Sequence, residues 1–319
     1  MNKKFFNVKK ILPLLLLLLL IGCNLKEQKI VYVAWNNKQD STSFVSTLIA
    51  IEATGAKVKI LEMAKSYDLM YDENNNLINA EDEYGALTEE TTSIIKKNLW
   101  HNSNVEELMK DVEYIVFPGG FDISPSLYGE KHKVIEGEME FSGERDVSDY
   151  MLLSYCIEKN IRTFTICRGM QMLSVVSGCK LIQDIPSYLN DSSKEFDYIH
   201  RDKYKKDFVY HDIEVLTEDS FLYKIMKKKI LKGVPSWHHQ STLDVNDTNL
   251  VITATTKTGK HDIIEAVERK DKSFIWGVQF HPEIAVCGKL DNNLNSESMD
   301  YDDAILFFSS LTDDRLKKE

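Results

Sequence analysis

Short apolar stretches rich in β-branched and aromatic residues alternate with helical stretches along much of this chain. The first four strand-like stretches lie at residues 29–35, 57–63, 112–117 and 161–166. Apolar residues recur at helical spacing in residues 41–54 and 145–159. Strands and helices that alternate at this spacing are typical of βαβ units. The pattern therefore predicts an α/β fold with a mostly parallel central sheet.

The second half of the chain contains more strands than helices. Further strands are expected at residues 207–216, 250–256, 263–268 and 274–280. A terminal amphipathic helix is expected from about residue 302 to residue 317, after a polar loop at 291–300. Residues 64–110 are polar and acidic, which suggests a surface insertion with some helix.

The N-terminus has the features of a bacterial export signal. Lysines among the first ten residues precede an apolar run at 11–21, which is shorter than the roughly 20 residues of a spanning helix. The run ends in Leu-Ile-Gly-Cys, which looks like a lipobox with lipid on Cys23. We expect residues 1–22 to be removed and the exported protein to be anchored by lipid to a bacterial membrane surface. A plain signal peptide and an uncleaved anchor are the alternatives.

Charge and motif content exclude several classes of function. The 39 Lys and Arg residues against 50 Asp and Glu residues give a net charge of −11, which argues against nucleic-acid binding through a broad basic surface. A phosphate loop of the GxxxxGK[ST] form is absent from the sequence. His238 and His239 are adjacent, which is not the spacing of a metal pair, and no CxxC occurs. No metal and no cofactor are therefore assigned.

Cys167 is the first residue that suggests chemistry. It lies where the strand-like stretch 161–166 runs into a helical stretch that ends at Gly178. A nucleophile at such a turn is exposed on a tight bend, and the N–H groups of the helix N-terminus stabilise a thiolate and can hold an oxyanion. A cysteine that follows an apolar strand is also commonly an inert core residue, so its position alone leaves both interpretations open.

Two other strand ends should lie at the same edge of the sheet as this cysteine. A Gly-Gly pair at 119–120 follows the strand 112–117, and such a pair lets backbone N–H groups approach a substrate carbonyl. A tight turn is the simpler interpretation of the pair. His-Pro-Glu at 281–283 ends the strand 274–280, so a histidine could take the thiol proton while a carboxylate orients it. Alone, this string would more commonly be a solvated surface pair.

In order along the chain, these elements resemble the class I glutamine amidotransferase-like fold. Within it they are similar to the gamma-glutamyl hydrolases, a group that includes the gamma-glutamyl-gamma-aminobutyrate hydrolases. The matching strings are FPGGFDISPSLYGE (117–130), RDVSD (145–149), TICRGMQMLSVVSG (165–178), HDIEV (211–215), VPSWHHQ (234–240) and GVQFHPE (277–283). The resemblance implies a three-layer α/β sandwich in one domain over residues 23–319, with the polar insertion at about 64–110.

The resemblance also implies a role for individual residues. It implies Cys167 as the nucleophile, His281 as the base and Glu283 as the orienting acid, with backbone N–H groups of Gly120 and Arg168 as oxyanion donors. The side chains expected near the glutamyl pocket are Gln171, His238, His239 and Gln240. The implied reaction is hydrolysis of a gamma-glutamyl amide, of the gamma-glutamyl-aminobutyrate or gamma-glutamyl peptide type, through a gamma-glutamyl thioester.

Two features favour a hydrolase over a glutaminase that supplies ammonia to a synthase. Arg168 follows the nucleophile, where synthase-linked glutaminases usually have a small or aliphatic residue, and the string PSLYGE (125–130) after the glycine pair looks like that of the hydrolases. The expected location agrees, since an exported protein has no obvious cytosolic synthase subunit as a partner that would receive ammonia. The chain departs from the family at Asp149, where Glu is usual, and at Pro235, where Asn is common. We expect both departures at the rim of the site, where they would affect the choice of substrate rather than catalysis.

Two other functions stay open at this point. Lipid-anchored α/β proteins of this size are often solute-binding proteins of transporters, and a degenerate homologue could bind gamma-glutamyl compounds without cleaving them. A binding module has no reason to carry a cysteine, a histidine and a glutamate in this pattern.

The five cysteines are an odd number, so they cannot all pair within one chain. With Cys23 assigned to lipid and Cys167 to catalysis, Cys156, Cys179 and Cys287 remain. We expect buried or partly buried free thiols, with one disulfide left open because export permits it.

Overall fold

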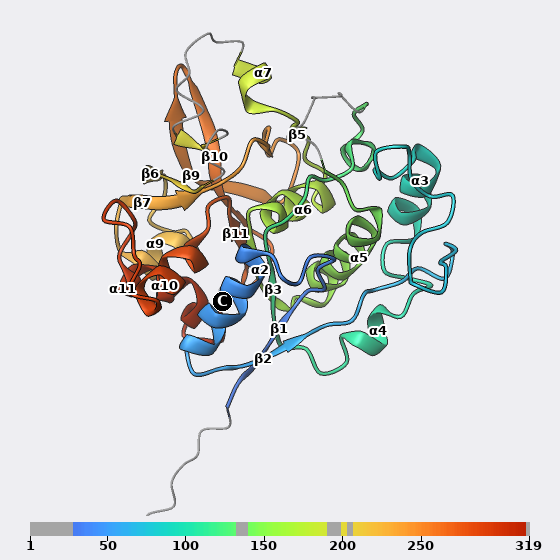
Figure 1. Cartoon of the computed structure of the whole chain (residues 1–319), viewed down its shortest axis with the longest axis horizontal. Helices are drawn as coiled ribbons and strands as arrows, with labels where there is room; N and C mark the ends of the chain where they lie inside the picture. The colour runs from blue at the N-terminus through green and yellow to red at the C-terminus, as the bar shows by residue number, and fades with distance from the viewer. Residues whose placement is uncertain (1–27, 132–139, 190–198, 203–206, 317–319) are drawn as a thin grey trace, which may run out of the picture.

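A nine-stranded sheet forms the centre of the computed structural model, which describes residues 28–131, 140–189, 199–202 and 207–316 (Figure 1). In spatial order its strands are β2 (Lys57–Ile60), β1 (Ile30–Val33), β3 (Tyr114–Phe117), β4 (Arg162–Ile166), β11 (Ile275–Val278), β10 (His261–Arg269), β9 (Leu250–Thr258), β6 (Val209–Val215) and β7 (Ile230–Ser236). A second, two-stranded sheet pairs β5 (Leu181–Ile182) with β8 (Ser241–Thr242).

The strands from β2 to β11 form the parallel part of the large sheet. Each neighbouring pair among β2, β1, β3, β4 and β11 is parallel. The strands β10, β9, β6 and β7 extend this part through antiparallel pairs. The predicted α/β fold is confirmed, and the candidate chemistry lies on the parallel part of the sheet.

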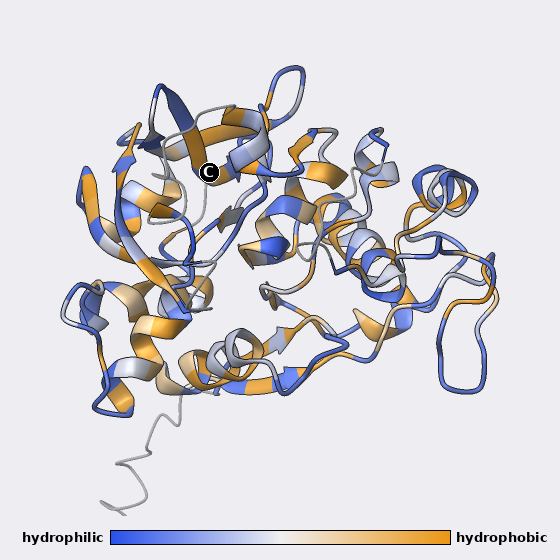
Figure 2. Cartoon of the chain, turned by 45° about the horizontal axis from the view of Figure 1, so that its top comes forward, coloured by the Kyte–Doolittle hydropathy of each residue, from blue (hydrophilic) through white to orange (hydrophobic). Residues whose placement is uncertain are grey.

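Helices cover both faces of the sheet and complete the three layers (Figure 1). Along β3, Val116 packs into one hydrophobic cluster, and Ile115 and Phe117 pack into another. The first cluster includes α2 (Thr42–Ala53), α10 (Pro282–Leu290) and α11 (Tyr301–Ser309), and the second includes α5 (Gly143–Lys159) and α6 (Arg168–Val176). Figure 2 shows apolar and polar residues interleaved along these helices, as packing against a sheet requires.

The polar segment at 64–110 contributes to the second cluster. It contains α3 (Glu89–Asn98), whose N-terminus is capped by the Thr88 side chain, and the short helix α4 (Val105–Leu108). Ile95 and Trp100 are nevertheless buried in the cluster with α5 and α6. The segment has the helix that its composition suggested, and it also supplies part of the core.

Several elements were not expected from the sequence. They are the strands β5, β7 and β8, the helices α7 (Ile185–Leu189) and α10, and the 3₁₀ turns at Pro125–Tyr128 and Ser310–Thr312. A further helix, α9 (Phe221–Met226), ends at the lysines 227–229. The terminal helix α11 is shorter than predicted, since it ends at Ser309.

The expected leader and Cys23 lie outside the described residues. Among the residues that are described, no helix combines the length and the hydropathy that a membrane crossing requires. The four described cysteines, Cys156, Cys167, Cys179 and Cys287, are all free thiols.

Candidate active site

Cys167 lies at the tight turn between β4 and α6. Its φ of +51° is in a region that residues with a side chain rarely adopt, at a cost of about 1–3 kcal/mol. The turn is held by the Cys167 N–H, which donates to the Val278 carbonyl at 2.8 Å. Gly169 keeps α6 close to the sheet, because a Cβ there would lie 2.3 Å from the carbonyl oxygen of Phe117. The thiol therefore sits at a helix N-terminus, which favours negative charge.

His281 and Glu283 approach the thiol from the neighbouring strand. Because β4 and β11 are parallel, with Ile166 opposite Val278, the segments that leave both strands meet at one edge of the sheet. His281 Nδ1 lies 2.7 Å from Glu283 Oε1, which also accepts a hydrogen bond of 2.7 Å from the Ser43 hydroxyl. With Nδ1 turned to the carboxylate, Nε2 is the ring nitrogen left for the thiol.

Two neighbours keep His281 protonated. Burial by itself lowers the pKa of His281, but the Glu283 carboxylate and the hydrogen-bonded sulfur of Cys167 outweigh burial and raise the pKa to about 10. An imidazolium beside a thiol sulfur can hold a thiolate ready for attack and can then protonate a leaving group.

The glycine pair after β3 leaves no room for side chains. A Cβ on Gly119 would lie 2.8 Å from Cε1 of His281. A Cβ on Gly120, whose φ is +155°, would lie 1.8 Å from Nη1 of Arg145. Gly120 lines the same cavity as Cys167, so the first expected oxyanion donor borders the candidate nucleophile.

A buried network of two arginines and two aspartates supports both expected oxyanion donors. The guanidinium of Arg168, the second expected donor, hydrogen-bonds to Asp149 and, at 2.5 Å, to Asp146. Arg145 Nε lies 3.4 Å from Asp149, and Arg145 Nη2 donates to the Pro118 carbonyl at 2.8 Å. The network therefore joins the turn at the thiol to the loop that carries the glycine pair.

The two departures from the family pattern do not lie at the rim, so that expectation is wrong. Asp149 is fully buried inside α5, where it faces two guanidinium groups. Pro235 is buried in β7, and its carbonyl accepts the His281 N–H at 2.8 Å. Asp149 thus contacts the residue that follows Cys167, and Pro235 contacts His281 directly.

Asp149→Asn is expected to destabilise the fold strongly. The change leaves Arg145 and Arg168 buried with only Asp146 to balance them, which should lower the free energy of unfolding by about 3–5 kcal/mol in urea titrations. The matched control is Glu218→Gln, which breaks an exposed pair with Lys229 and should cost less than about 1 kcal/mol. Similar losses in the two variants would contradict this account of the network.

A cavity of about 240 Å³ adjoins the thiol. The side chains expected near the glutamyl pocket, namely Gln171, His238, His239 and Gln240, all line it. Gln171 donates to the Gln240 carbonyl at 3.1 Å and to Oε1 of Gln279 at 3.2 Å. His238 lies in the wall, but its Nδ1 bonds to the Gln240 carbonyl at 2.9 Å and its Nε2 faces His200 at 3.2 Å.

The cavity wall carries charges of both signs. Nε2 of His239 lies 3.1 Å from Asp122, and Nδ1 lies 3.3 Å from Asp184. Burial lowers the pKa of His239, but these carboxylates outweigh burial and raise it to about 9, so the ring is cationic at neutral pH. Arg201 and Glu140 also line the cavity. Such a wall is suited to a ligand that bears an ammonium and a carboxylate group.

A family model described as Peptidase C26 matches residues 70–283, about two thirds of the chain. This protein belongs to the peptidase C26 family. Membership places it among the hydrolases, in agreement with the predicted class of reaction.

The relatives of this C26 family member include amidotransferase-like proteins and hydrolases. It is 34% identical over 176 residues to protein NtpR of Enterococcus hirae, covering 54% of this chain and 67% of NtpR. It is 32% identical over 222 residues to a glutamine amidotransferase-like protein of Rickettsia prowazekii, covering 58% and 75%. It is 28% identical over 185 residues to the gamma-glutamyl-gamma-aminobutyrate hydrolase PuuD of Escherichia coli K12, covering 57% and 68%.

Two side chains that were not predicted form hydrogen bonds to the candidate catalytic residues in the described structure. Gln279 donates to the sulfur of Cys167 at 3.5 Å, and its place within GVQFHPE was a usable signal. Ser43 donates to Glu283 from the first turn of α2, and nothing in its local sequence indicates that role.

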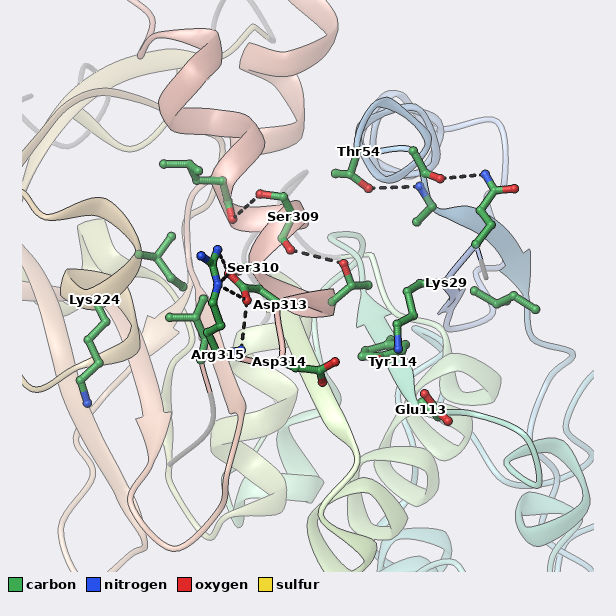
Figure 3. Close-up of a pocket in the computed structure, with 18 of the residues that line it drawn as sticks. Lys29, Thr54, Glu113, Tyr114, Lys224, Ser309, Ser310, Asp313, Asp314 and Arg315 are labelled. Carbon is green, nitrogen blue, oxygen red and sulfur yellow. Dashed lines mark hydrogen bonds and ion pairs between the residues drawn. The ribbon is translucent and has the colours of Figure 1, made fainter. Parts of the chain in front are cut away.

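A second hollow in this protein, of about 1840 Å³, is larger than the cavity beside Cys167 (Figure 3). Lys29, which precedes β1, and Tyr114, the first residue of β3, line it on one side. The C-terminal segment with Asp313 and Arg315 also lines it. No cysteine or histidine occurs among the described residues that line it. Ligands of open α/β sheets bind at the carboxyl ends of the strands, so we place the candidate active site at Cys167 instead.

Proposed function

We propose that this protein hydrolyses gamma-glutamyl amides through a gamma-glutamyl thioester on Cys167. The observation that carries the proposal is the strained turn that presents Cys167 beside a protonated His281, itself held by Glu283. The hydrolase named among the relatives supports the same class of substrate.

In the first half of the proposed reaction, the thiolate of Cys167 attacks the γ-carbonyl carbon. The carbonyl electron pair moves onto oxygen, where the N–H groups of Gly120 and Arg168 would stabilise it. When the tetrahedral intermediate collapses, the C–N bond breaks and His281 gives its proton to the departing amine. The product is a thioester between the glutamyl group and the cysteine.

In the second half, water attacks the thioester and the now neutral His281 takes a proton from it. Collapse of this intermediate breaks the C–S bond, releases the γ-carboxylic acid, which loses its proton to solvent, and restores the thiolate and imidazolium pair. The glutamyl end would bind with its ammonium group toward Asp122 and Glu140 and its carboxylate toward His239 and Arg201.

A substrate panel tests the reaction. The purified protein is incubated with gamma-glutamyl-aminobutyrate, gamma-glutamyl peptides and poly-gamma-glutamate, and released glutamate is measured. An α-glutamyl dipeptide is the matched control, because its amide lies on the wrong carboxyl group. We expect release from at least one γ-linked compound and none from the control. Absence of release from every γ-linked compound would favour a binding protein.

Iodoacetamide labelling separates an enzyme from a binding module without a known substrate. Burial raises the pKa of Cys156 to about 12 and that of Cys179 to about 11, and it also raises the pKa of Cys287, so these thiols are protonated at neutral pH. We therefore expect Cys167 to be alkylated first at pH 7, as followed by peptide mass spectrometry. Labelling of Cys287 at the same rate as Cys167 would count against an activated nucleophile.

We also propose that the protein is exported and anchored by lipid on Cys23. The support is the basic, apolar and lipobox-like order of residues 1–23. Cys23→Ala should abolish incorporation of a labelled fatty acid, whether or not the apolar run then stays in the membrane as an uncleaved anchor. Fatty-acid incorporation that persists in the variant would contradict lipid anchoring on Cys23.

A further inference from the structure

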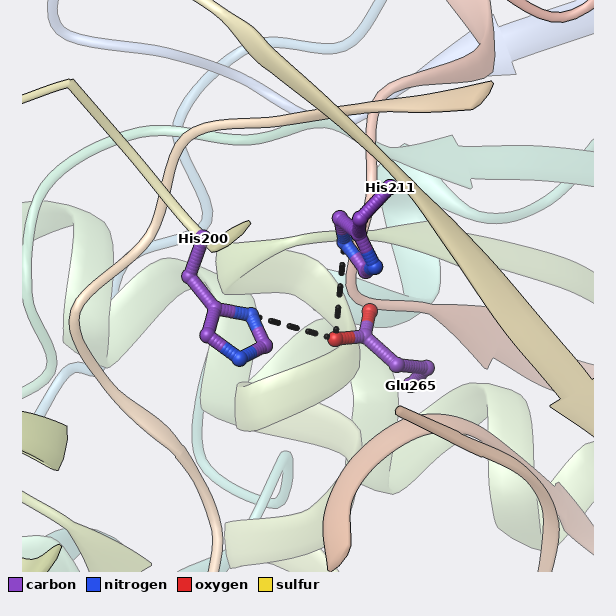
Figure 4. Close-up of side chains that lie close together, drawn as sticks. All are labelled: His200, His211 and Glu265. Carbon is purple, nitrogen blue, oxygen red and sulfur yellow. Dashed lines mark ion pairs between the residues drawn. The ribbon is translucent and has the colours of Figure 1, made fainter. Parts of the chain in front are cut away.

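Three histidines surround one buried glutamate behind the wall of the cavity. Figure 4 shows His200 and His211 directed at the same oxygen of Glu265, and His238 approaches that oxygen as well. The four residues come from four separate segments: β6, β10, residues 199–202 and the turn after β7. The side chain of Glu265 is fully buried, and His211, the most exposed of the four, is only 9% exposed.

The ligand atoms of His200, His211 and Glu265 all lie within 4.8 Å of one another. Glu265 Oε1 lies 3.4 Å from His200 Nδ1, 3.8 Å from His211 Nε2 and 3.7 Å from His238 Nε2. His200 Nδ1 lies 3.2 Å from His238 Nε2. Zinc with ligands at about 2.0–2.1 Å in a tetrahedron places those ligands about 3.3–3.4 Å apart. The separation of Glu265 Oε1 from His200 Nδ1 lies close to that value, and its separation from His211 Nε2 is a few tenths of an ångström longer.

Each histidine is fixed through the nitrogen that faces away from the glutamate. His200 Nε2 lies 2.7 Å from the Thr258 hydroxyl, and His211 Nδ1 lies 3.0 Å from the Thr256 hydroxyl. The Thr256 hydroxyl itself donates to the Asp212 carbonyl, so it accepts the proton of His211 Nδ1. His238 Nδ1 bonds to a backbone carbonyl in the same way. Outer oxygen partners of this kind orient the imidazole ligands of metals and leave the inner nitrogen with its lone pair.

His200 Nδ1 and His238 Nε2 are within hydrogen-bond distance of each other, but other inner atoms have no such partner. Neither carboxylate oxygen of Glu265 nor Nε2 of His211 has a hydrogen-bond partner of ordinary geometry in the described structure. A buried carboxylate without a full set of partners is costly, and a divalent cation at this point would compensate it.

We propose that His200, His211 and Glu265 hold a zinc ion. Imidazole and carboxylate are ligand types that zinc prefers, and three protein ligands leave a fourth position to water. The metal would join the His200 segment to β6 and β10, and the His238 N–H, which donates to the His200 carbonyl at 3.1 Å, ties the turn after β7 to that segment. Since Trp237 and His239 flank His238 and line the cavity, the metal would hold part of its wall.

Metal content and thermal stability test the site without any activity assay. Protein stripped with a chelator is reloaded with Zn²⁺ alone, and bound zinc is measured by plasma mass spectrometry and by competition with a chromophoric chelator. We expect one zinc per chain and a melting temperature higher by about 5–10 °C than that of stripped protein. Glu265→Gln and His211→Gln should each weaken zinc binding at least about 100-fold and abolish the shift.

His261→Gln is the matched control, because His261 lies on the same strand as Glu265 but outside the cluster. It should bind zinc as the unchanged protein does. If the substituted proteins do not fold, Co²⁺ bound to the unchanged protein decides, since tetrahedral coordination gives intense visible absorption. Zinc content well below one per chain, zinc binding unaffected by Glu265→Gln, or weak octahedral-type Co²⁺ absorption would each overturn the site.

Discussion

Cys167→Ala is expected to leave the protein folded and to reduce kcat for gamma-glutamyl amide hydrolysis at least about 10⁴-fold. The substitution removes only the sulfur, and alanine adopts the turn with φ of +51° at a cost similar to that of cysteine. Without the thiolate no thioester forms, so only the oxyanion donors and the bound geometry remain to assist water. Glutamate release at saturating substrate measures the loss.

Cys179→Ala is the matched control for the nucleophile. Cys179 is buried to a similar extent but lies beyond the C-terminus of α6, and it does not line the cavity. Its removal should change kcat less than about twofold. A second measurement, the mass of unchanged protein quenched during turnover, should show one glutamyl group on Cys167. Full activity of Cys167→Ala would exclude the proposed mechanism.

The site elements nearest to the thiol were predictable because they end neighbouring strands. The strands β3, β4 and β11 are adjacent and parallel, and they are followed by Gly120, Cys167 and His281. Because the carboxyl ends of parallel strands meet at one edge of the sheet, the strand ends in the sequence predict that these residues lie together. Ser43 and Arg145 could not be found in that way. Ser43 meets Glu283 across 240 residues, and Arg145 reaches the glycine loop from inside a helix.

The strand β7 was missed for a local reason. Its sequence contains Gly233 and Pro235, which lower the strand propensity of a segment. Gly233 has a φ of +63°, and a Cβ there would lie 2.0 Å from the Glu297 carbonyl oxygen. The pairing of β6 with β7 is also irregular between His211 and Ile213. The strand is thus held by its neighbours rather than by its own residues.

The early end of α11 has a tertiary cause. The amphipathic pattern continues to about residue 317, but the helix stops at Ser309. The guanidinium of Arg162, at the start of β4, donates hydrogen bonds to the carbonyls of Ser310, Leu311 and Asp313. Hydrogen bonds to Arg162 thus take the place of the backbone hydrogen bonds that would continue the helix. No pattern within the terminal segment indicates them.

Glu283→Gln is expected to lower kcat/KM by about 10³- to 10⁴-fold while the fold is retained. The carboxylate accepts the Nδ1 proton of His281, which leaves Nε2 to exchange a proton with the thiol. A glutamine amide can instead donate to Nδ1 and so place the ring proton on Nε2. That tautomer cannot take a proton from the attacking water.

The pH dependence of kcat/KM distinguishes this role from a loss of packing. Despite burial, Glu283 and Cys167 raise the pKa of His281 to about 10, so the imidazolium persists as pH rises toward that value. Removing the negative charge should lower the pKa of His281 and move the alkaline limb of kcat/KM to lower pH. Ser43→Ala, which removes a 2.7 Å hydrogen bond to Glu283 but keeps its charge, should cost less than about tenfold and leave that limb nearly in place. An unmoved alkaline limb in Glu283→Gln would mean that another group keeps His281 protonated.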